Sequence, residues 1–197
     1  MVLMSMKRAL ISVYDTTGIV CFARELVKLG FEIISTGGTF DALKDGGVQS
    51  VKHVSDVTGF PEILNGRVKT EHPKLIGAIL ALRDNKEHMK ELERFQIEPF
   101  DVVVCNLYPF ERVTSQGADL KSALENIDVG GPNMVRAAAK NFENVTVIVN
   151  PRRYDEVLRE YREKGDVSAE TRKVLAVEAF KETAHYDSAI YRFLKKV

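Results

Sequence analysis

The sequence predicts an α/β fold: one domain, residues 1–197, built on a parallel sheet flanked by helices. Three observations predict it. Short apolar runs rich in β-branched residues recur along the chain, most of them precede a segment of helical periodicity, and glycines or prolines separate the two kinds of segment. Strands that alternate with helices form mostly parallel sheets covered on both faces. The length of 197 residues suits a single domain.

The first third of the chain predicts three strands. Residues 9–13 form the first, and Gly18 then opens a helix in which Ile19, Phe22 and Leu26 share one face. Gly30 ends that helix, residues 31–35 predict the second strand, and a short helix runs to the glycine pair at 46–47. Residues 48–54 predict the third strand. Residues 55–68 show little periodicity and predict a long loop, a kind of segment that is often functional.

The rest of the chain continues the alternation. Residues 73–82 and 86–95 predict helices, and residues 100–105 predict a buried strand. Helices are expected at 120–127 and at 132–141, the latter with Pro132 at its first position. Residues 144–149 predict a strand and residues 154–163 a helix. Residues 168–194 predict a long C-terminal helix, capped by Ser168, that packs on the domain or on a second subunit.

Composition favours a small-molecule ligand. Lysine plus arginine and aspartate plus glutamate number 28 each, so no excess charge favours nucleic acid or a membrane surface. The apolar runs are far shorter than the roughly 20 residues that cross a bilayer. Residues 1–6 lack the features of a secretory signal, so we expect a cytoplasmic protein. The two cysteines, Cys21 and Cys105, are expected to be reduced core residues.

Two turns carry hydroxyls and glycines where strands end. They are residues 12–18 and the string Ser35-Thr36-Gly37-Gly38-Thr39. Ligands of open α/β sheets bind at the carboxyl ends of the strands, and glycine-rich turns before helices suit phosphate. An ordinary tight turn with capping threonines is an equally good interpretation.

Further polar residues follow the later strands. Residues 65–74 hold three cations and His72, in a segment that is either a solvated charge run or a site for an anion or a polar base. His72 has no partner at metal-ligand spacing, so we expect no metal site. Asn106 and Tyr108 emerge from a buried strand, and Asp128 precedes a glycine pair, as a helix cap or as a functional carboxylate.

Four strings in order resemble a known family. They are Ser35-Thr36-Gly37-Gly38-Thr39, Arg67-Val68-Lys69-Thr70 with His72-Pro73-Lys74, Asn106-Leu107-Tyr108-Pro109-Phe110, and residues 126–140. Together they resemble the IMP cyclohydrolase domain of the bifunctional AICAR transformylase/IMP cyclohydrolase of purine biosynthesis, in register from about residue 7 to about residue 191. The family's fold is similar to that of methylglyoxal synthase, which agrees with the predicted parallel sheet.

The resemblance implies a reaction and a set of roles. 5-Formamidoimidazole-4-carboxamide ribonucleotide would close to inosine monophosphate (IMP) with loss of water and without a cofactor. The implied catalytic residues are Lys69, Tyr108, Asp128 and Lys140. In this hypothesis Asp128 and Lys140 move protons at the amide nitrogen, and Lys69 and Tyr108 donate to the formyl oxygen. The implied substrate-binding residues are Ser12, Ser35, Thr36, Gly37, Gly38, Thr39, Arg67, Thr70, Asn106 and Gly130.

The resemblance also implies a homodimer. For a lysine to act as an acid near neutral pH, Arg67, Lys69 and Lys140 would cluster around one pocket. The family's transformylase domain would follow Val197, so we expect a functional link to a separate AICAR formyltransferase. Four positions depart from the family pattern, none of them catalytic: a usual lysine, leucine and two histidines are replaced by Thr16, Glu71, Ile76 and Phe142.

Two alternatives remain open. A purine nucleotide-binding regulatory module of the same fold would need the phosphate site but none of the catalytic residues. Methylglyoxal synthase shares the fold, but it uses acidic residues and histidine rather than lysine and tyrosine, a pattern that this sequence does not match.

Overall fold

The computed structural model describes residues 6–197 and contains one parallel sheet of five strands. The strand order is β3-β2-β1-β4-β5, and every neighbouring pair is parallel. The strands are β1 (Lys7–Val13), β2 (Phe31–Ser35), β3 (Val51–His53), β4 (Val102–Asn106) and β5 (Thr146–Ile148). The predicted α/β fold is therefore confirmed. Of residues 1–6, for which the sequence predicts no export signal, only Met6 lies within the described residues.

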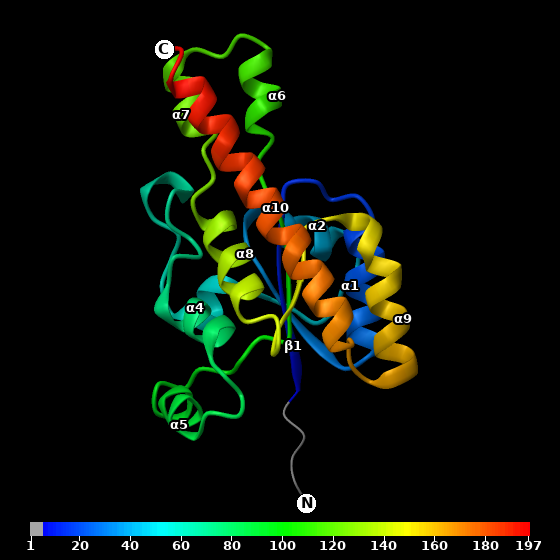
Figure 1. Ribbon diagram of the computed structural model, residues 1–197. Helices are drawn as coiled ribbons and strands as arrows, with labels where there is room; N and C mark the ends of the chain where they lie inside the picture. Colours follow the sequence, from blue (N-terminus) through cyan, green and yellow to red (C-terminus); the bar gives the residue numbers. More distant parts are fainter. Residues whose placement is uncertain (1–5) are drawn as a thin grey trace, which may run out of the picture.

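Helices cover both faces of the sheet (Figure 1). The helices α1 (Ile19–Lys28), α2 (Gly37–Asp45) and α9 (Tyr154–Lys164) pack on one side. The helices α4 (Pro73–Leu80) and α8 (Gly130–Lys140) pack on the other, and α10 (Ala169–Leu194) lies along α8 and β5. Because both faces are covered, all five residues of β2 are buried, including the polar Glu32 and Ser35.

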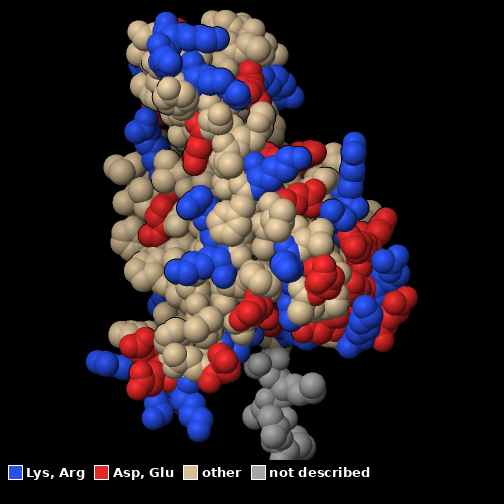
Figure 2. All heavy atoms as spheres, in the orientation of Figure 1, with Lys and Arg blue, Asp and Glu red and all other residues tan. Residues whose placement is uncertain are grey.

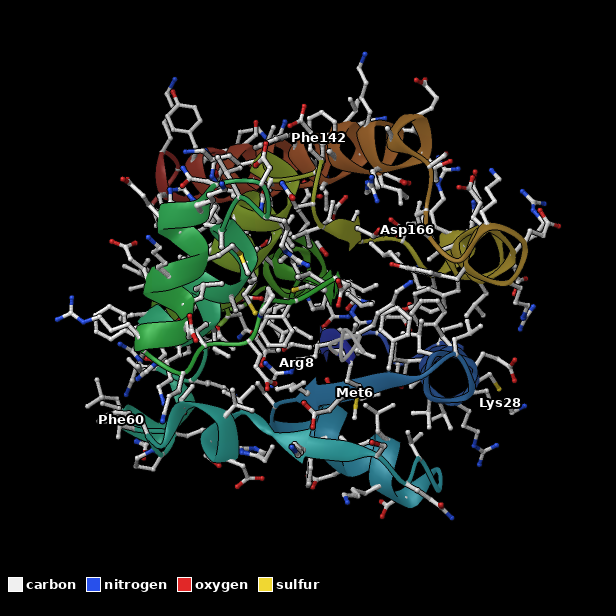
Figure 3. All side chains as sticks on the ribbon, turned by 90° about the horizontal axis from the view of Figure 1, so that it is seen from below. Met6, Arg8, Lys28, Phe60, Phe142 and Asp166 are labelled. Carbon is white, nitrogen blue, oxygen red and sulfur yellow. The ribbon has the colours of Figure 1, made fainter. Side chains whose placement is uncertain are left out.

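A charged pair lies inside the molecule near the start of the sheet. The Arg8 guanidinium is almost fully buried, and its Nε donates to Glu32 Oε2 at 2.8 Å across β1 and β2. Its Nη1 donates to the carbonyl oxygen of Glu98 at 2.9 Å. Figure 3, seen from the end where Met6 precedes β1, shows Arg8 near the middle of the molecule and Phe60 at its rim. Hydrogen bonds to both sides of the guanidinium offset the cost of burying its charge.

The segment between β3 and α4 differs from the expected long loop. It contains the helix α3 (Val54–Thr58) and the 3-10 turn η1 (Leu64–Gly66). The side chain of His53 caps α3 by accepting from the Ser55 backbone N–H. A helix of five residues is too short to produce a readable periodicity, and β3 is correspondingly shorter than the predicted strand at 48–54.

Two more features differ from expectation. The helix α6 (Phe110–Ser115) follows Pro109, where only a turn was expected. The helix α8 begins at Gly130, so Pro132 is its third rather than its first residue; a proline is tolerated there because the first N–H groups of a helix have no intrahelical partner. Cys105 is buried as expected, but Cys21 is exposed on α1, so the prediction of a core residue is wrong for Cys21.

The remaining helical segments are α5 (Lys86–Arg94), α7 (Leu120–Glu125) and η2 (Pro151–Arg153). The predicted C-terminal helix is confirmed: α10 spans 26 residues, and the Ser168 side chain accepts from the Thr171 backbone N–H at 3.2 Å. The end of α10 extends beyond the sheet together with α6 and α7 (Figure 1). Within residues 6–197, no helix is both long and apolar enough to span a membrane.

Candidate functional site

The candidate site lies at the carboxyl ends of β1, β2 and β4. The chain builds the sheet outward from β1 on one side through β2 and β3, and on the other side through β4 and β5. The strand order therefore reverses between β1 and β4, and the crevice outside such a reversal is where open α/β sheets bind their ligands. Most of the residues singled out from the sequence follow these strands or start the helices after them.

The turn after β2 has the features of an anion site. Thr36 caps the nine-residue helix α2, and its Oγ1 lies 3.0 Å from Ser12 Oγ at the end of β1. Gly37 has a φ of +44°, a left-handed conformation that favours glycine, and a Cβ at Gly38 would meet nothing within 4 Å. The two hydroxyls therefore lie beside the first N–H groups of α2, which have no partner within the helix.

The hydroxyls of the neighbouring Ser35 and Thr39 bond to the protein backbone and hold this turn in place. Thr39 Oγ1 accepts from the Val13 N–H and donates to the Val13 carbonyl, both at 2.9 Å. Ser35 Oγ donates to the Ile11 carbonyl at 2.7 Å. Both side chains are buried and tie the ends of β1 and β2 together. These two hydroxyls therefore already have backbone partners, whereas the Ser12 and Thr36 hydroxyls bond to each other.

Lys69 lies over the start of α2. Its Nζ is 3.6 Å from the position of a Cβ at Gly37, and 3.8 Å from Glu62 Oε2. The other oxygen of Glu62 lies 4.0 Å from His53 Nε2. A positive side chain at the N-terminus of a helix strengthens a site for anions. Glu62 was not identified from the sequence, because a single acidic residue in an aperiodic segment carries no signal.

Asp128 lies just before α8. Its Oδ1 accepts from the Gly131 N–H at 2.8 Å, so the carboxylate does cap the helix, and the Tyr108 backbone also hydrogen-bonds to it. Burial raises the pKa of Asp128, the hydrogen bond from Gly131 opposes that shift, and the charge of Glu71 adds to it. A buried carboxyl group with a raised pKa is a candidate for proton transfer.

Tyr108 lies at the rim of the site, directly after β4. Its ring packs edge-on against Tyr14 with the centroids 5.5 Å apart, and the Tyr14 hydroxyl accepts from Arg112 at 2.9 Å. The Tyr108 side chain is 42% exposed, so it can reach a ligand without displacing the core. The tyrosine therefore lies beside Asp128, whose carboxylate its backbone binds.

Thr70 and Gly130 meet at the start of α8. A Cβ added at Gly130 would collide with Thr70 Oγ1 and would lie 2.8 Å from Glu71 Oε1. Only glycine leaves space for these two side chains. The loop that carries Lys69 thus packs directly against the helix that follows Asp128.

Arg67 and Asn106 have partners within the protein. Arg67 forms a salt bridge with Glu125 on α7, with Nε 3.3 Å from Oε2. Asn106 Oδ1 accepts from the N–H groups of Tyr14 and Asp15 at 2.7 and 2.8 Å, and its Nδ2 donates to the Asp15 carbonyl. The carboxamide of Asn106 therefore shapes the loop after β1.

The structure does not bring Lys140 into this group. Lys140 is the last residue of α8, and α8 leads back to the start of β5, at the edge of the sheet opposite the site. At 1.5 Å per residue, the ten steps from Gly130 to Lys140 correspond to about 15 Å. The expected cluster of Arg67, Lys69 and Lys140 around one pocket is therefore wrong within one chain.

The departures from the family pattern have distinct surroundings. Ile76 and Phe142 are partly buried against the core, where apolar side chains pack well. Thr16 is exposed in the loop after β1. Glu71 alone lies inside the site.

A cavity of about 660 Å³ also opens nearby, and Tyr14 and Asn106 are among its lining residues.

Comparison with known proteins identifies the class of this fold and site. Residues 18–133, more than half of the chain, match the family described as MGS-like domain, and the chain belongs to that family. Residues 138–197 match the family described as AICARFT/IMPCHase bienzyme.

Particular relatives are more specific. The chain is 57% identical over 190 residues to the bifunctional purine biosynthesis protein PurH of Persephonella marina, and 56% identical over 189 residues to PurH of a Thermoanaerobacter species. These alignments cover 96% and 95% of this chain but 37% of each relative, so the chain spans little more than a third of their length. A solved structure, "Crystal structure of ForH", aligns with a TM-score of 0.85 and 34% identity over 96% of this chain and 97% of that one.

Proposed function

We propose that this chain is an IMP cyclohydrolase. It closes the second purine ring by converting 5-formamidoimidazole-4-carboxamide ribonucleotide into IMP with loss of water. The observation that carries the proposal is that residues 69–71 reach both the start of α2, near Gly37, and the start of α8, which Asp128 precedes. The similarity to PurH over nearly the whole chain supports it.

Substrate binding follows from the geometry of the two helix starts. The 5′-phosphate binds at the N-terminus of α2, where Ser12, Thr36 and the backbone N–H groups of Gly37 and Gly38 donate hydrogen bonds. The Lys69 ammonium adds positive charge there. The base then extends toward α8, where Thr70 and Gly130 meet. Arg67 binds the base after its salt bridge with Glu125 breaks. Breaking this bridge costs little free energy, because exposed salt bridges contribute roughly 0–1 kcal/mol.

The chemistry requires positioning and proton transfer. The carboxamide nitrogen attacks the formyl carbon of the same molecule, and the carbinolamine that forms loses its oxygen as water. Holding two groups of one molecule in an attacking pose contributes roughly 7–11 kcal/mol. No oxidant or reductant takes part, so the reaction needs no cofactor. Asp128 takes the proton from the nitrogen, and Lys69 and Tyr108 donate to the oxygen that leaves.

Lys140 has no direct part in this mechanism within one chain. In this proposal Lys140 does not exchange a proton with Asp128, because ten helical steps separate it from Gly130 at the start of α8. Lys140 can then contribute in one of two ways. It reaches the site of a second copy of the chain, or it stabilises α8, because the C-terminal end of a helix favours a positive charge.

The proposal extends to the cellular context. As a biosynthetic enzyme acting on a nucleotide, the protein works in the cytoplasm, together with an AICAR formyltransferase that supplies the formylated substrate. We also propose a homodimer, because exposed apolar residues line the outer side of α10, among them Val177 at 64% and Tyr191 at 62% exposure.

The test is an absorbance assay. The purified chain is mixed with the formylated substrate, and ring closure is followed by the ultraviolet change that accompanies formation of the purine. IMP formation at a rate proportional to enzyme concentration supports the proposal. Tight binding of IMP without turnover would instead identify a nucleotide-binding regulatory module. If the chain shows neither turnover nor IMP binding, both functions are rejected.

A further inference from the structure

Glu71 bonds to the backbone of the loop that carries Lys69. Its Oε2 accepts from the N–H groups of Lys69 and Thr70, at 2.9 and 3.0 Å. Hydrogen bonds from N–H groups to a carboxylate are among the stronger ones in proteins. One oxygen of Glu71 therefore fixes the backbone from which the Lys69 side chain extends.

The other oxygen of Glu71 faces α8. Oε1 lies 2.8 Å from the position of a Cβ at Gly130, the first residue of that helix. The Glu71 side chain is only partly exposed there. The N-terminus of a helix favours a negative charge, so the start of α8 stabilises the Glu71 carboxylate in this position.

Asp128 lies within the field of this carboxylate. The charged and titratable groups facing Asp128 are Glu71 and Lys69 from the loop, Cys105 from β4 and Tyr186 from α10, whose hydroxyl accepts from the Asp128 backbone N–H at 2.8 Å. Glu71 raises the pKa of Asp128, and Lys69 lowers it. Apart from burial, Glu71 is the group that favours the protonated form.

We propose that Glu71 is a positioning residue that couples Lys69 to Asp128: it fixes the backbone of Lys69 and holds a negative charge beside Asp128 at the start of α8. The catalytic part of this inference rests on the proposed function. The two structural parts, a fixed loop and a neighbouring charge, stand without it.

Two substitutions separate these parts. Glu71→Gln keeps an oxygen that accepts the two N–H groups but removes the charge, whereas Glu71→Leu removes both. Glu91→Gln, on the exposed surface of α5, is the matched control. Circular dichroism and the melting temperature establish that each variant folds.

Two measurements on the full chain need no turnover. In carbon-13 NMR, the carboxyl signal of Asp128, assigned with Asp128→Asn, should titrate at lower pH in Glu71→Gln than in the parent. In amide hydrogen exchange, Lys69 and Thr70 should exchange at least tenfold faster in Glu71→Leu, because a lost bond of about 1.5 kcal/mol corresponds to such a factor. Their exchange should stay near the parental rate in Glu71→Gln, and the control should change neither observable.

Turnover adds the catalytic readout. Misplacement of a catalytic group costs on the order of tenfold to a hundredfold in rate, so kcat should fall by that factor in Glu71→Leu with KM nearly unchanged, and Glu71→Gln should recover part of it. An unshifted Asp128 titration together with unchanged Lys69 exchange would overturn the inference. If the parent chain shows no ring closure while both NMR effects appear, the proposed function fails and the coupling stands.

Discussion

At the scale of single residues, Lys69 and Asp128 are the groups on which the mechanism depends. We expect Lys69→Ala and Asp128→Ala to lower kcat by two orders of magnitude or more without changing the fold, because both groups act in the transition state. The affinity for IMP should change little in Asp128→Ala but should fall in Lys69→Ala, because Lys69 also lies over the start of α2. Steady-state kinetics and calorimetric titration with IMP measure the two effects. Lys86→Ala, on α5 away from the site, is the control. Near-parental kcat in both variants would remove these residues from the mechanism.

Glu62 should matter through Lys69. Its carboxylate lies 3.8 Å from Lys69 Nζ, so Glu62→Gln frees the ammonium from its position over α2. The expected result is a fall in kcat of about tenfold, partly restored in Glu62→Asp, which keeps the charge. Glu125→Gln is a suitable comparison, because it releases Arg67 instead and should leave kcat unchanged or improve substrate binding. Equal effects of the two Gln substitutions on kcat would contradict this role.

At this scale the structure brings together part of the residues that the sequence singles out. The strings around Thr36, Lys69, Tyr108 and Asp128 were predictable, because parallel topology brings the ends of strands to one edge. Lys140 was misplaced, since its four-residue spacing from Arg136 indicates a shared helix face but not which edge of the sheet the helix end reaches.

Glu62 and Glu71 act through loop geometry that the sequence does not reveal. The backbone between them contains two non-glycine residues with positive φ, Leu64 at 54° and Asn65 at 55°. Such conformations are uncommon for these residues, so no pattern of residue types indicates where the chain turns. The contacts of both carboxylates could therefore be found only from the fold.

At the scale of elements, all five strands were predicted, although β3 is shorter than expected. The bounds of β2 coincide with the predicted 31–35, because glycine precedes it and a hydroxyl-rich turn follows. The short helices α3 and α6 were missed, since five or six residues give less than two turns of periodicity. The extent of α10 was clear from its Ser168 cap and its length.

The junction of α9 and α10 gives a pH-dependent prediction. Glu160 accepts from the Ser168 backbone N–H at 2.6 Å and from Thr171 Oγ1 at 2.7 Å, and these hydrogen bonds lower its pKa from 4.5 to about 2. Because the folded pKa is the lower one, this stabilisation is complete above pH 4.5 and is lost as the pH falls through about 2.

The measurement is urea unfolding of the parent and of Glu160→Gln across this range. The parent should have the higher free energy of unfolding at pH 6, and the difference should shrink steadily between about pH 5 and pH 2. Glu163→Gln, on an exposed side of the same helix, should show no such dependence. A parent–variant difference that stays constant with pH would exclude the proposed contribution of Glu160.

At the scale of the whole molecule, the surface charge is mixed. On the face shown in Figure 2, Lys and Arg side chains are interspersed with Asp and Glu side chains, in keeping with the equal totals of 28 each. Affinity for the anionic substrate therefore depends on the local arrangement at α2 and Lys69 rather than on net charge.

The exposed apolar side of α10 gives a prediction about assembly. We expect light scattering at micromolar concentration to give twice the mass of one chain. Val177→Lys or Tyr191→Glu should shift the protein toward the monomer, because each places a charge in a buried apolar contact. The control is Glu91→Lys, an exposed charge substitution on α5, away from α10. A parent that is monomeric at this concentration would rule out the homodimer.

The most direct test of the central claim follows the reacting carbon itself. The substrate is labelled with carbon-13 at the formyl group and incubated with the parent chain, and NMR follows the label. The account predicts that the formyl signal is replaced by that of a carbon within the purine ring of IMP, and that Lys69→Ala and Asp128→Ala slow this conversion strongly. A formyl signal that persists at the uncatalysed rate, or that appears as free formate, would contradict it.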